Sequence, residues 1–192
     1  MNTSSKSLNL STLLSSVRES EIFWVIALSV LTAISAQVSI PVKPVPFTLQ
    51  TMMVLLAGAF LGSKNGAYSM LLYIFLGAIG LPVFAQTADG TMGFARLIGP
   101  TGGYLLAFPV AAYLVGYFTE KSQKYSSIII SMFAAELVVI FIGTFYLYAA
   151  YLHNLMDAIK AGAAIFSLWM VIKIIAAAAI YFSISKKQPR LP

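Results

Sequence analysis

The sequence predicts an all-α integral membrane protein, a single domain with six transmembrane helices. Hydrophobic residues make up 59% of the chain, charged residues make up only 9%, and the mean hydropathy is +0.88. A soluble domain carries about 25% charged residues, so this composition cannot supply a normal water-exposed surface. The apolar residues also fall into stretches that approach the ~20 residues needed to cross a bilayer.

Six stretches are expected to be helices, and they lie at residues 22–40, 50–61, 67–81, 102–119, 126–151 and 162–185. The second and third are short, and we expect them to form a helical hairpin with residues 62–66 as its connector. Pro41, Pro44 and Pro46 follow the first helix. Because each proline fixes φ and restrains the residue before it, this segment is predicted to be extended.

The stretch from residue 80 to residue 105 is predicted to be a long irregular loop. It reads GLPVFAQTADGTMGFARLIGPTGGYL, in which glycines and two prolines interrupt an otherwise apolar, helical chain. Irregular backbone beside membrane spans is tolerated only where protein covers it or where it faces water. The loop is therefore a candidate for the substrate-facing part of the protein, and an ordinary connector is the alternative interpretation.

The basic residues predict the orientation in the membrane. The chain has 12 basic and 6 acidic residues, and six crossings place eight basic residues on the side that holds both termini. The other side holds Lys43, Arg96 and Lys160. By the positive-inside rule both termini are cytoplasmic. Residues 1–21 and 186–192 are then cytoplasmic tails of a bundle at 22–185, and the N-terminal tail does not resemble a cleaved signal.

Several function classes are excluded by missing residues. The chain has no cysteine and only one histidine, which rules out thiol chemistry and argues against a histidine-based metal site and against an enzyme. It also lacks the G-x-x-x-x-G-K-[ST] nucleotide motif. In a membrane protein, an excess of basic residues such as the net charge of +6 here usually marks cytoplasmic loops. No nucleic-acid partner is therefore expected. Energy for transport must therefore come from an ion gradient or from a partner protein.

Two ionisable residues fall inside predicted spans, namely Glu136 in the fifth and Lys173 in the sixth. Each costs roughly 2.5–3.5 kcal/mol at membrane depth, so each is a functional-site hypothesis. An ammonium that faces an outward cavity suits an anionic ligand such as a carboxylate. The alternative is a structural ion pair between the two, which their expected difference in depth disfavours.

Two further features concern the surface of the bundle. Small residues of the first span recur at intervals of about four and predict a docking face for another membrane subunit, formed by Ser29, Ala33 and Ala36. Trp24 and Trp169 fit the aromatic belt at the membrane interfaces better than a ligand-stacking site, and a stacking role for one aromatic residue stays open as the alternative.

Three motifs resemble the BioY family over about residues 22–185. They are PVPFTLQ, GAFLGSKNGAYSMLLYIFLGAIGLPVFA and GPTGGYLLAF. The resemblance implies a substrate-binding (S) component of an energy-coupling factor (ECF) transporter, a six-helix bundle in the cell membrane. It implies that the chain captures external biotin without any cofactor. It also implies partners, in which the first helix docks on a transmembrane coupling subunit driven by two ATPase subunits.

The same resemblance implies the binding residues. The family carries a G-D-x-x-K motif in its last helix, whose lysine corresponds to Lys173, whereas its aspartate corresponds to Met170. A polar residue of the outer loop corresponds to Asp89 or Thr91. Gln50 of the first motif and Tyr104 of the last complete the expected pocket. Biotin suits such a site, because its carboxylate needs a cation and its rings need an apolar wall.

Two other transport functions stay open. Met170 favours an S component for a different vitamin or small carboxylate, which competition binding would reveal. A stand-alone carrier would agree with the missing nucleotide motif, although the chain has no inverted repeat.

Overall fold

The structure is a computed structural model, and it describes residues 20–87, 90–162 and 166–185. In chain order the elements are α2 (Glu21–Gln37), β1 (Ser39–Ile40), β2 (Phe47–Thr48), α3 (Gln50–Ala78), the 3₁₀ helix η1 (Gly93–Arg96), α4 (Gly102–Lys121), α5 (Tyr125–Leu147), the π-helical turn η2 (Tyr148–Leu152), α6 (Leu155–Gly162) and α7 (Phe166–Ser185). The predicted all-helical architecture is confirmed. The predicted tails lie almost entirely outside the described residues.

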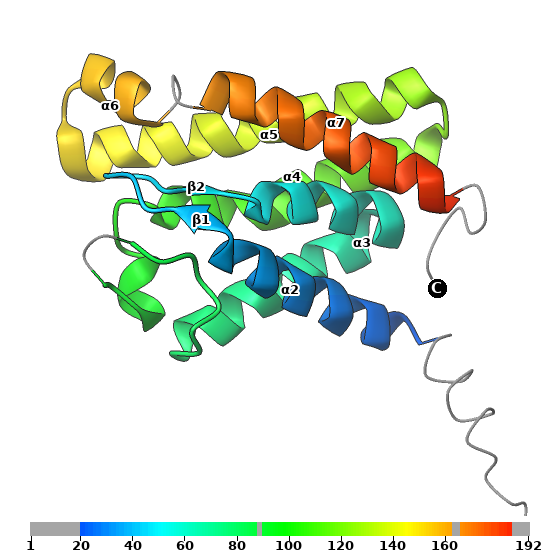
Figure 1. The fold of residues 1–192 in the computed structure, drawn as a ribbon, viewed down its shortest axis with the longest axis horizontal. Coiled ribbons are helices and arrows are strands. Elements are labelled where there is room, and N and C mark those ends of the chain that lie inside the picture. Colours follow the sequence, from blue (N-terminus) through cyan, green and yellow to red (C-terminus); the bar gives the residue numbers. More distant parts are fainter. Residues whose placement is uncertain (1–19, 88–89, 163–165, 186–192) are drawn as a thin grey trace, which may run out of the picture.

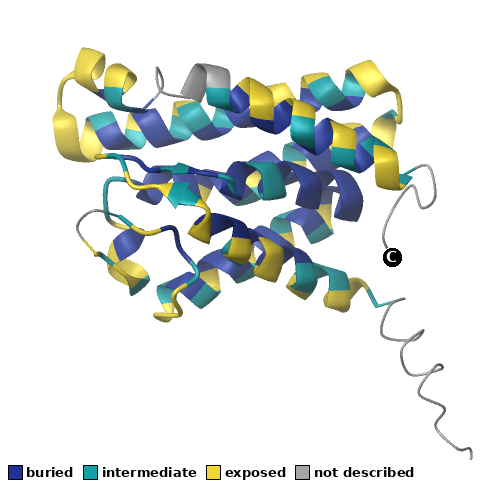
Figure 2. Ribbon diagram, viewed as in Figure 1, coloured by how far each residue is buried: buried dark blue, intermediate teal, exposed yellow. Residues whose placement is uncertain are grey.

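The described helices carry the outer surface of a membrane protein. Two helical segments are long and apolar enough to cross a bilayer, Gly102–Lys121 and Tyr125–Leu152, and shorter apolar helices lie at Glu21–Gln37 and Trp169–Ser185. Figure 2 shows exposed residues along the outward faces of these helices, and many of them are large and apolar, such as Ile26, Ile34, Phe141 and Ile175. Exposed apolar area on this scale marks a surface that meets lipid or another protein.

The helical hairpin predicted for residues 50–81 turns at a single residue, Gly62, inside α3 (Figure 1). The predicted connector of five residues is wrong, because Ser63 to Gly66 are already helical. Gly62 has φ 79° and ψ −174°, a conformation that favours glycine. Glu120 of α4 then caps the second half of α3, since one carboxylate oxygen accepts a hydrogen bond from the Ser63 amide at 2.8 Å.

Glycines allow α4 to approach this turn closely. A Cβ atom at Gly116 would meet the backbone of Gly62 and Ser63, and one at Gly58 would meet the carbonyl of Ala112. Neither contact can be relieved without moving the backbones of α3 and α4 apart.

Gly116→Ala is therefore expected to destabilise the protein by about 1–3 kcal/mol, the usual effect of an oversized side chain in a tight contact. The measurement is the thermal unfolding midpoint of the purified protein in detergent. Leu106→Ala, on the exposed side of the same helix, is the matched control and should change the midpoint little. An unchanged midpoint for Gly116→Ala would contradict the close contact.

Two predicted helix boundaries are corrected. The first helix ends at Gln37 rather than at residue 40, because Ser39 and Ile40 pair in an antiparallel ladder with Thr48 and Phe47. The Pro41–Pro46 segment forms the connection between these strands. Gly162 does not begin the last helix but ends α6, a short helix that starts where Asn154 accepts hydrogen bonds from the following backbone amides.

α3 is central to the bundle, since it packs against α2, α4 and α7, while α5 packs against α4 and α7. The core among these helices is apolar, and its largest fully buried side chains include Tyr73, Tyr181, Leu55 and Met132. Figure 1 shows the start of α2 and the end of α7 at one end of the bundle. The β1–β2 connection, the central loop and α6 lie at the opposite end (Figure 1).

The small residues of α2 lie on its inner side. Ser29 and Ala36 have no exposed surface, and Ala33 is half-buried against the core. Small side chains at these positions allow α2 to approach α3 of the same chain. Ser29 and Ala36 are therefore not exposed to a second subunit, contrary to the interpretation of this stripe as an open docking face.

Candidate functional site

An inner cavity of about 40 Å³ opens at the end of the bundle that holds the two irregular segments. The β1–β2 connection, the central loop and helices α3, α4 and α5 contribute its walls. The lining residues are Val45, Pro46, Thr48, Gln50, Thr51, Phe84, Ala85, Arg96, Thr101, Tyr104, Leu105 and Val139.

Two outer cavities of about 230 and 240 Å³ continue from the inner one. The first shares Arg96 and Thr101 with the inner cavity, and the second shares Thr87 and Thr91 with the first. The first outer cavity is lined by residues of both the β1–β2 connection and the central loop. The prediction that these two segments share one face is therefore confirmed.

Arg96 is the cation that lines both the inner and the first outer cavity. It is only 4% exposed. Its guanidinium donates hydrogen bonds to the Thr87 hydroxyl and, at 2.9 Å, to the carbonyl of Ala85. A guanidinium held in this way presents a fixed planar set of donors to a carboxylate. The sequence analysis missed this role, although Arg96 is a lone basic residue in an outer, glycine-rich loop.

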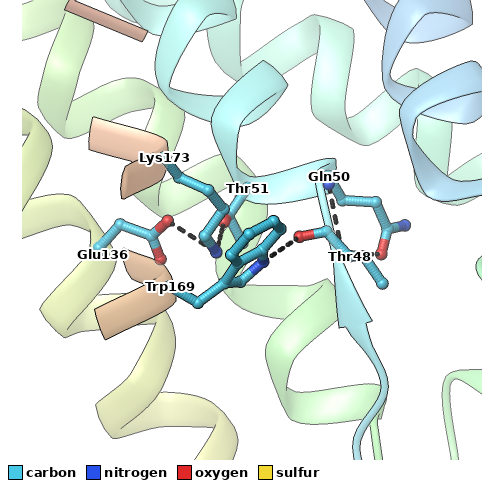
Figure 3. Close-up of polar contacts among 6 residues, drawn as sticks. All are labelled: Thr48, Gln50, Thr51, Glu136, Trp169 and Lys173. Carbon is cyan, nitrogen blue, oxygen red and sulfur yellow. Dashed lines mark hydrogen bonds and ion pairs between the residues drawn. The ribbon is translucent and has the colours of Figure 1, made fainter. Parts of the chain in front are cut away.

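Lys173 forms a buried ion pair with Glu136, with 3.2 Å between Nζ and Oε1 (Figure 3). The two side chains are 2% and 1% exposed. Lys173 also donates a hydrogen bond to the Thr51 hydroxyl. The structural pairing left open by the sequence is thus observed, and the expected difference in depth is wrong.

The depths match because α5 and α7 run in opposite directions through the bundle (Figure 1). Glu136 lies 11 residues after the start of α5 at Tyr125 (136 − 125), and Lys173 lies 12 residues before the end of α7 at Ser185 (185 − 173). At 1.5 Å per residue both are roughly 17 Å from the same end of the bundle, so the two side chains lie at the same level.

The ion pair lies behind the inner cavity rather than on its surface. Lys173 and Glu136 do not line the cavity, whereas Thr51, which accepts the hydrogen bond from Lys173, does. Val139, one helical turn after Glu136, also lines it. Lys173 was expected to face the cavity. In the structure the Thr51 hydroxyl lies between the Lys173 ammonium and the cavity.

Gln50 and Trp169 build the polar side of the cavity. The Gln50 amide donates to the Tyr73 hydroxyl, and its carbonyl oxygen accepts from the Thr48 hydroxyl at 3.1 Å. The indole nitrogen of Trp169 donates to the Thr48 carbonyl at 3.2 Å (Figure 3). Trp169 therefore supports the wall of the site, a role that the sequence analysis did not assign to it.

The remaining predicted site residues are divided among the cavities. Tyr104 is buried and lines the inner cavity, with its hydroxyl 3.2 Å from that of Thr144. Thr91 is half-buried and lines both outer cavities. Asp89 lies outside the described residues.

Side chains from three elements hold the loop that forms one cavity wall. Gln37 of α2 donates to the carbonyls of Pro82 and Phe84, at 3.3 and 3.4 Å. Tyr73 of α3 donates to the carbonyl of Val83 at 3.1 Å, and Arg96 donates to the carbonyl of Ala85. Four successive carbonyls are thus bound, so the wall is positioned by α2, α3 and η1 together.

Among the described residues, no group of histidine, cysteine, aspartate and glutamate side chains is arranged to hold a metal ion.

Comparisons with known proteins agree with one another. The model of the BioY family matches residues 5–190. The biotin transporter BioY of Thermotoga maritima is 38% identical over 156 residues, which cover 81% of this chain and 90% of that protein. The probable biotin transporter BioY of Pyrococcus horikoshii is 42% identical over 112 residues, which cover 58% and 67%.

The fold is also that of a solved structure. A crystal structure of the S-component for biotin from an ECF-type ABC transporter matches with a TM-score of 0.79 and 26% identity, over 94% of this chain and 96% of that one. The described helices, the cavity at their irregular end and these similarities together assign the protein, and the chain belongs to the BioY family.

Proposed function

We propose that the chain binds biotin on the outer side of the membrane and delivers it as the S component of an ECF-type transporter. The observation that carries the proposal is the inner cavity, where a buried guanidinium meets a largely apolar wall. The matched proteins named as biotin transporters, and the solved S-component for biotin, support the ligand. The family is one of transporters, and the protein is not an enzyme.

Different residues of the cavities suit the different chemical groups of biotin. Arg96 lines the first outer cavity as well as the inner one, so we place the carboxylate there. Phe84, Leu105 and Val139 offer an apolar wall for the rings and the thioether. Lys173 is already neutralised by Glu136, and we propose that it acts on the ligand through Thr51.

The residues implied by the resemblance keep their roles as proposals. Gln50 and Tyr104 are proposed to contact the ligand in the inner cavity, and Thr91 to contact it on the way in. Asp89 is proposed as a further polar contact of the outer loop.

The proposed topology has six crossings with cytoplasmic termini in the cell membrane. Both halves of α3, together with α2, α4, α5 and α7, supply six segments. The described ends of the chain lie at one end of the bundle, as an even number of crossings requires (Figure 1). Lys64, Lys121 and Lys124 are exposed near the turns at that end, which supports a cytoplasmic location by the positive-inside rule.

The proposed partners are a transmembrane coupling subunit and two ATPase subunits. The chain has no nucleotide-binding motif of its own, and the matched crystal structure is named as part of an ECF-type ABC transporter. Docking through α2 would use its exposed apolar side, which includes Ile26, Val30 and Ile34.

The test is direct binding by the purified chain, measured by calorimetry with biotin, with biotinamide and with other vitamins. We expect saturable binding of biotin and weaker binding of the uncharged biotinamide. Tighter binding of another vitamin would overturn biotin as the ligand. Net biotin uptake by proteoliposomes that contain this chain alone would instead favour the stand-alone carrier over the S component.

A further inference from the structure

The β1–β2 connection carries one basic side chain, Lys43, at the outer end of the molecule. Lys43 is exposed, and it lines the first outer cavity together with Pro44, Thr87 and Arg96. The same cavity leads to the inner one through Arg96 and Thr101. Lys43 therefore stands on the path by which a ligand reaches the buried guanidinium.

The charged residues among the described ones that line the three cavities, Lys43 and Arg96, are both basic. None of the described residues that line the three cavities is a carboxylate. Within the described parts of the chain, Lys43 forms neither a hydrogen bond nor an ion pair, whereas the deeper cations are engaged by Thr87 and Ala85 or by Glu136. The charge of Lys43 is thus directed to the solvent at the cavity mouth.

The backbone keeps this charge in place. Pro41, Pro44 and Pro46 flank Lys43, and proline restricts both its own φ and the conformation of the residue before it. Flanking strands β1 and β2 are also paired to each other. A lysine on such a short, restrained connection remains near the cavity instead of sampling a large volume.

We propose that Lys43 is a capture residue, which attracts the carboxylate of the ligand to the cavity mouth and raises the association rate before Arg96 binds it. The inference rests on the proposed function, because it requires an anionic ligand. A cation at the mouth of a cleft with low-dielectric walls raises association rates, and salt suppresses the effect. The Debye length falls from about 10 Å at 0.1 M salt to about 3 Å at 1 M salt.

The experiment measures association and dissociation rates of biotin by stopped flow, with the full chain in nanodiscs of zwitterionic lipid, at low salt and at 1 M salt. Lys43→Glu reverses the charge, and Lys43→Gln removes it. Lys160→Glu is the matched control, because Lys160 is exposed on α6 at the same end of the bundle but lines none of these cavities (Figure 1).

We expect Lys43→Glu to lower the association rate constant about tenfold at low salt, with Lys43→Gln between it and the wild type. The difference should vanish at 1 M salt, the dissociation rate constant should stay within about twofold, and biotinamide should not sense the substitution. Lys160→Glu should have a much smaller effect.

Three results would overturn the inference: equal effects of Lys43→Glu and Lys160→Glu, an effect that persists at 1 M salt, or an equal effect on biotinamide, which would indicate a change of loop shape. Each of these leaves biotin binding by the wild type intact. If the wild type itself binds no biotin, it is the proposed function that fails.

Discussion

Lys173→Met is expected to destabilise the protein by about 3–5 kcal/mol, because it leaves the Glu136 carboxylate buried without its cation. Glu136 is 1% exposed, and none of the described side chains besides Lys173 forms an ion pair with it. The measurement is the thermal or denaturant-induced unfolding of the protein in detergent. The double variant Glu136→Leu/Lys173→Met removes both charges and should recover most of the stability, since apolar replacements of buried pairs are often neutral.

The same variants separate two roles of Lys173 in binding. Because Lys173 reaches the inner cavity only through Thr51, we expect Lys173→Met to weaken biotin and biotinamide by the same factor. If Lys173 contacted the carboxylate directly, Lys173→Met would weaken the binding of biotin but not of biotinamide. A double-mutant-type cycle of variant and ligand would show that coupling. Unchanged stability of Lys173→Met, or a double variant less stable than either single one, would contradict a structural ion pair.

Arg96→Gln is expected to reduce biotin affinity by about 2–5 kcal/mol, the usual loss when one partner of a buried charged contact is truncated. This corresponds to a rise in Kd of about 30-fold or more. The loss should lie mainly in a faster dissociation rate, and biotinamide should lose much less. Arg96→Lys should recover part of the affinity, because it restores the charge but not the planar fork of donors.

Thr87→Val is the control for the second role of Arg96, which is to hold the loop in place through hydrogen bonds. It removes the hydroxyl that accepts from Arg96 while it leaves the guanidinium and its bond to the Ala85 carbonyl in place. We expect a modest effect on affinity, equal for both ligands. If Arg96→Gln weakened biotin and biotinamide equally, the carboxylate would not bind at Arg96.

The sequence predicted the features that depend on local chemistry. Apolar stretches predicted helices, and the starts of α3 at Gln50 and of α4 at Gly102 were placed correctly. The three prolines after the first helix predicted an extended segment, which is the β1–β2 connection. Each of these follows from residues that are adjacent in the chain, whose dihedral preferences or hydropathy act without help from distant elements.

Errors arose where a distant side chain completes a local structure. Residues 62–66 have the composition of a loop, but Glu120 supplies the cap that allows a helix to begin at Ser63. α6 was missed because its eight residues are too few for a membrane span, and only the asparagine before it marks the start.

The sequence by itself determined that this is a membrane-embedded helical transporter with two irregular loops and a lysine and a glutamate inside its spans. Only the tertiary structure decided that Glu136 and Lys173 meet, that Arg96 rather than Lys173 faces the cavity, and that Trp169 supports its wall. The physical reason is that helix formation is encoded locally, whereas the partner of a buried charge depends on the relative register of packed helices. That register is set by many contacts between residues far apart in the chain.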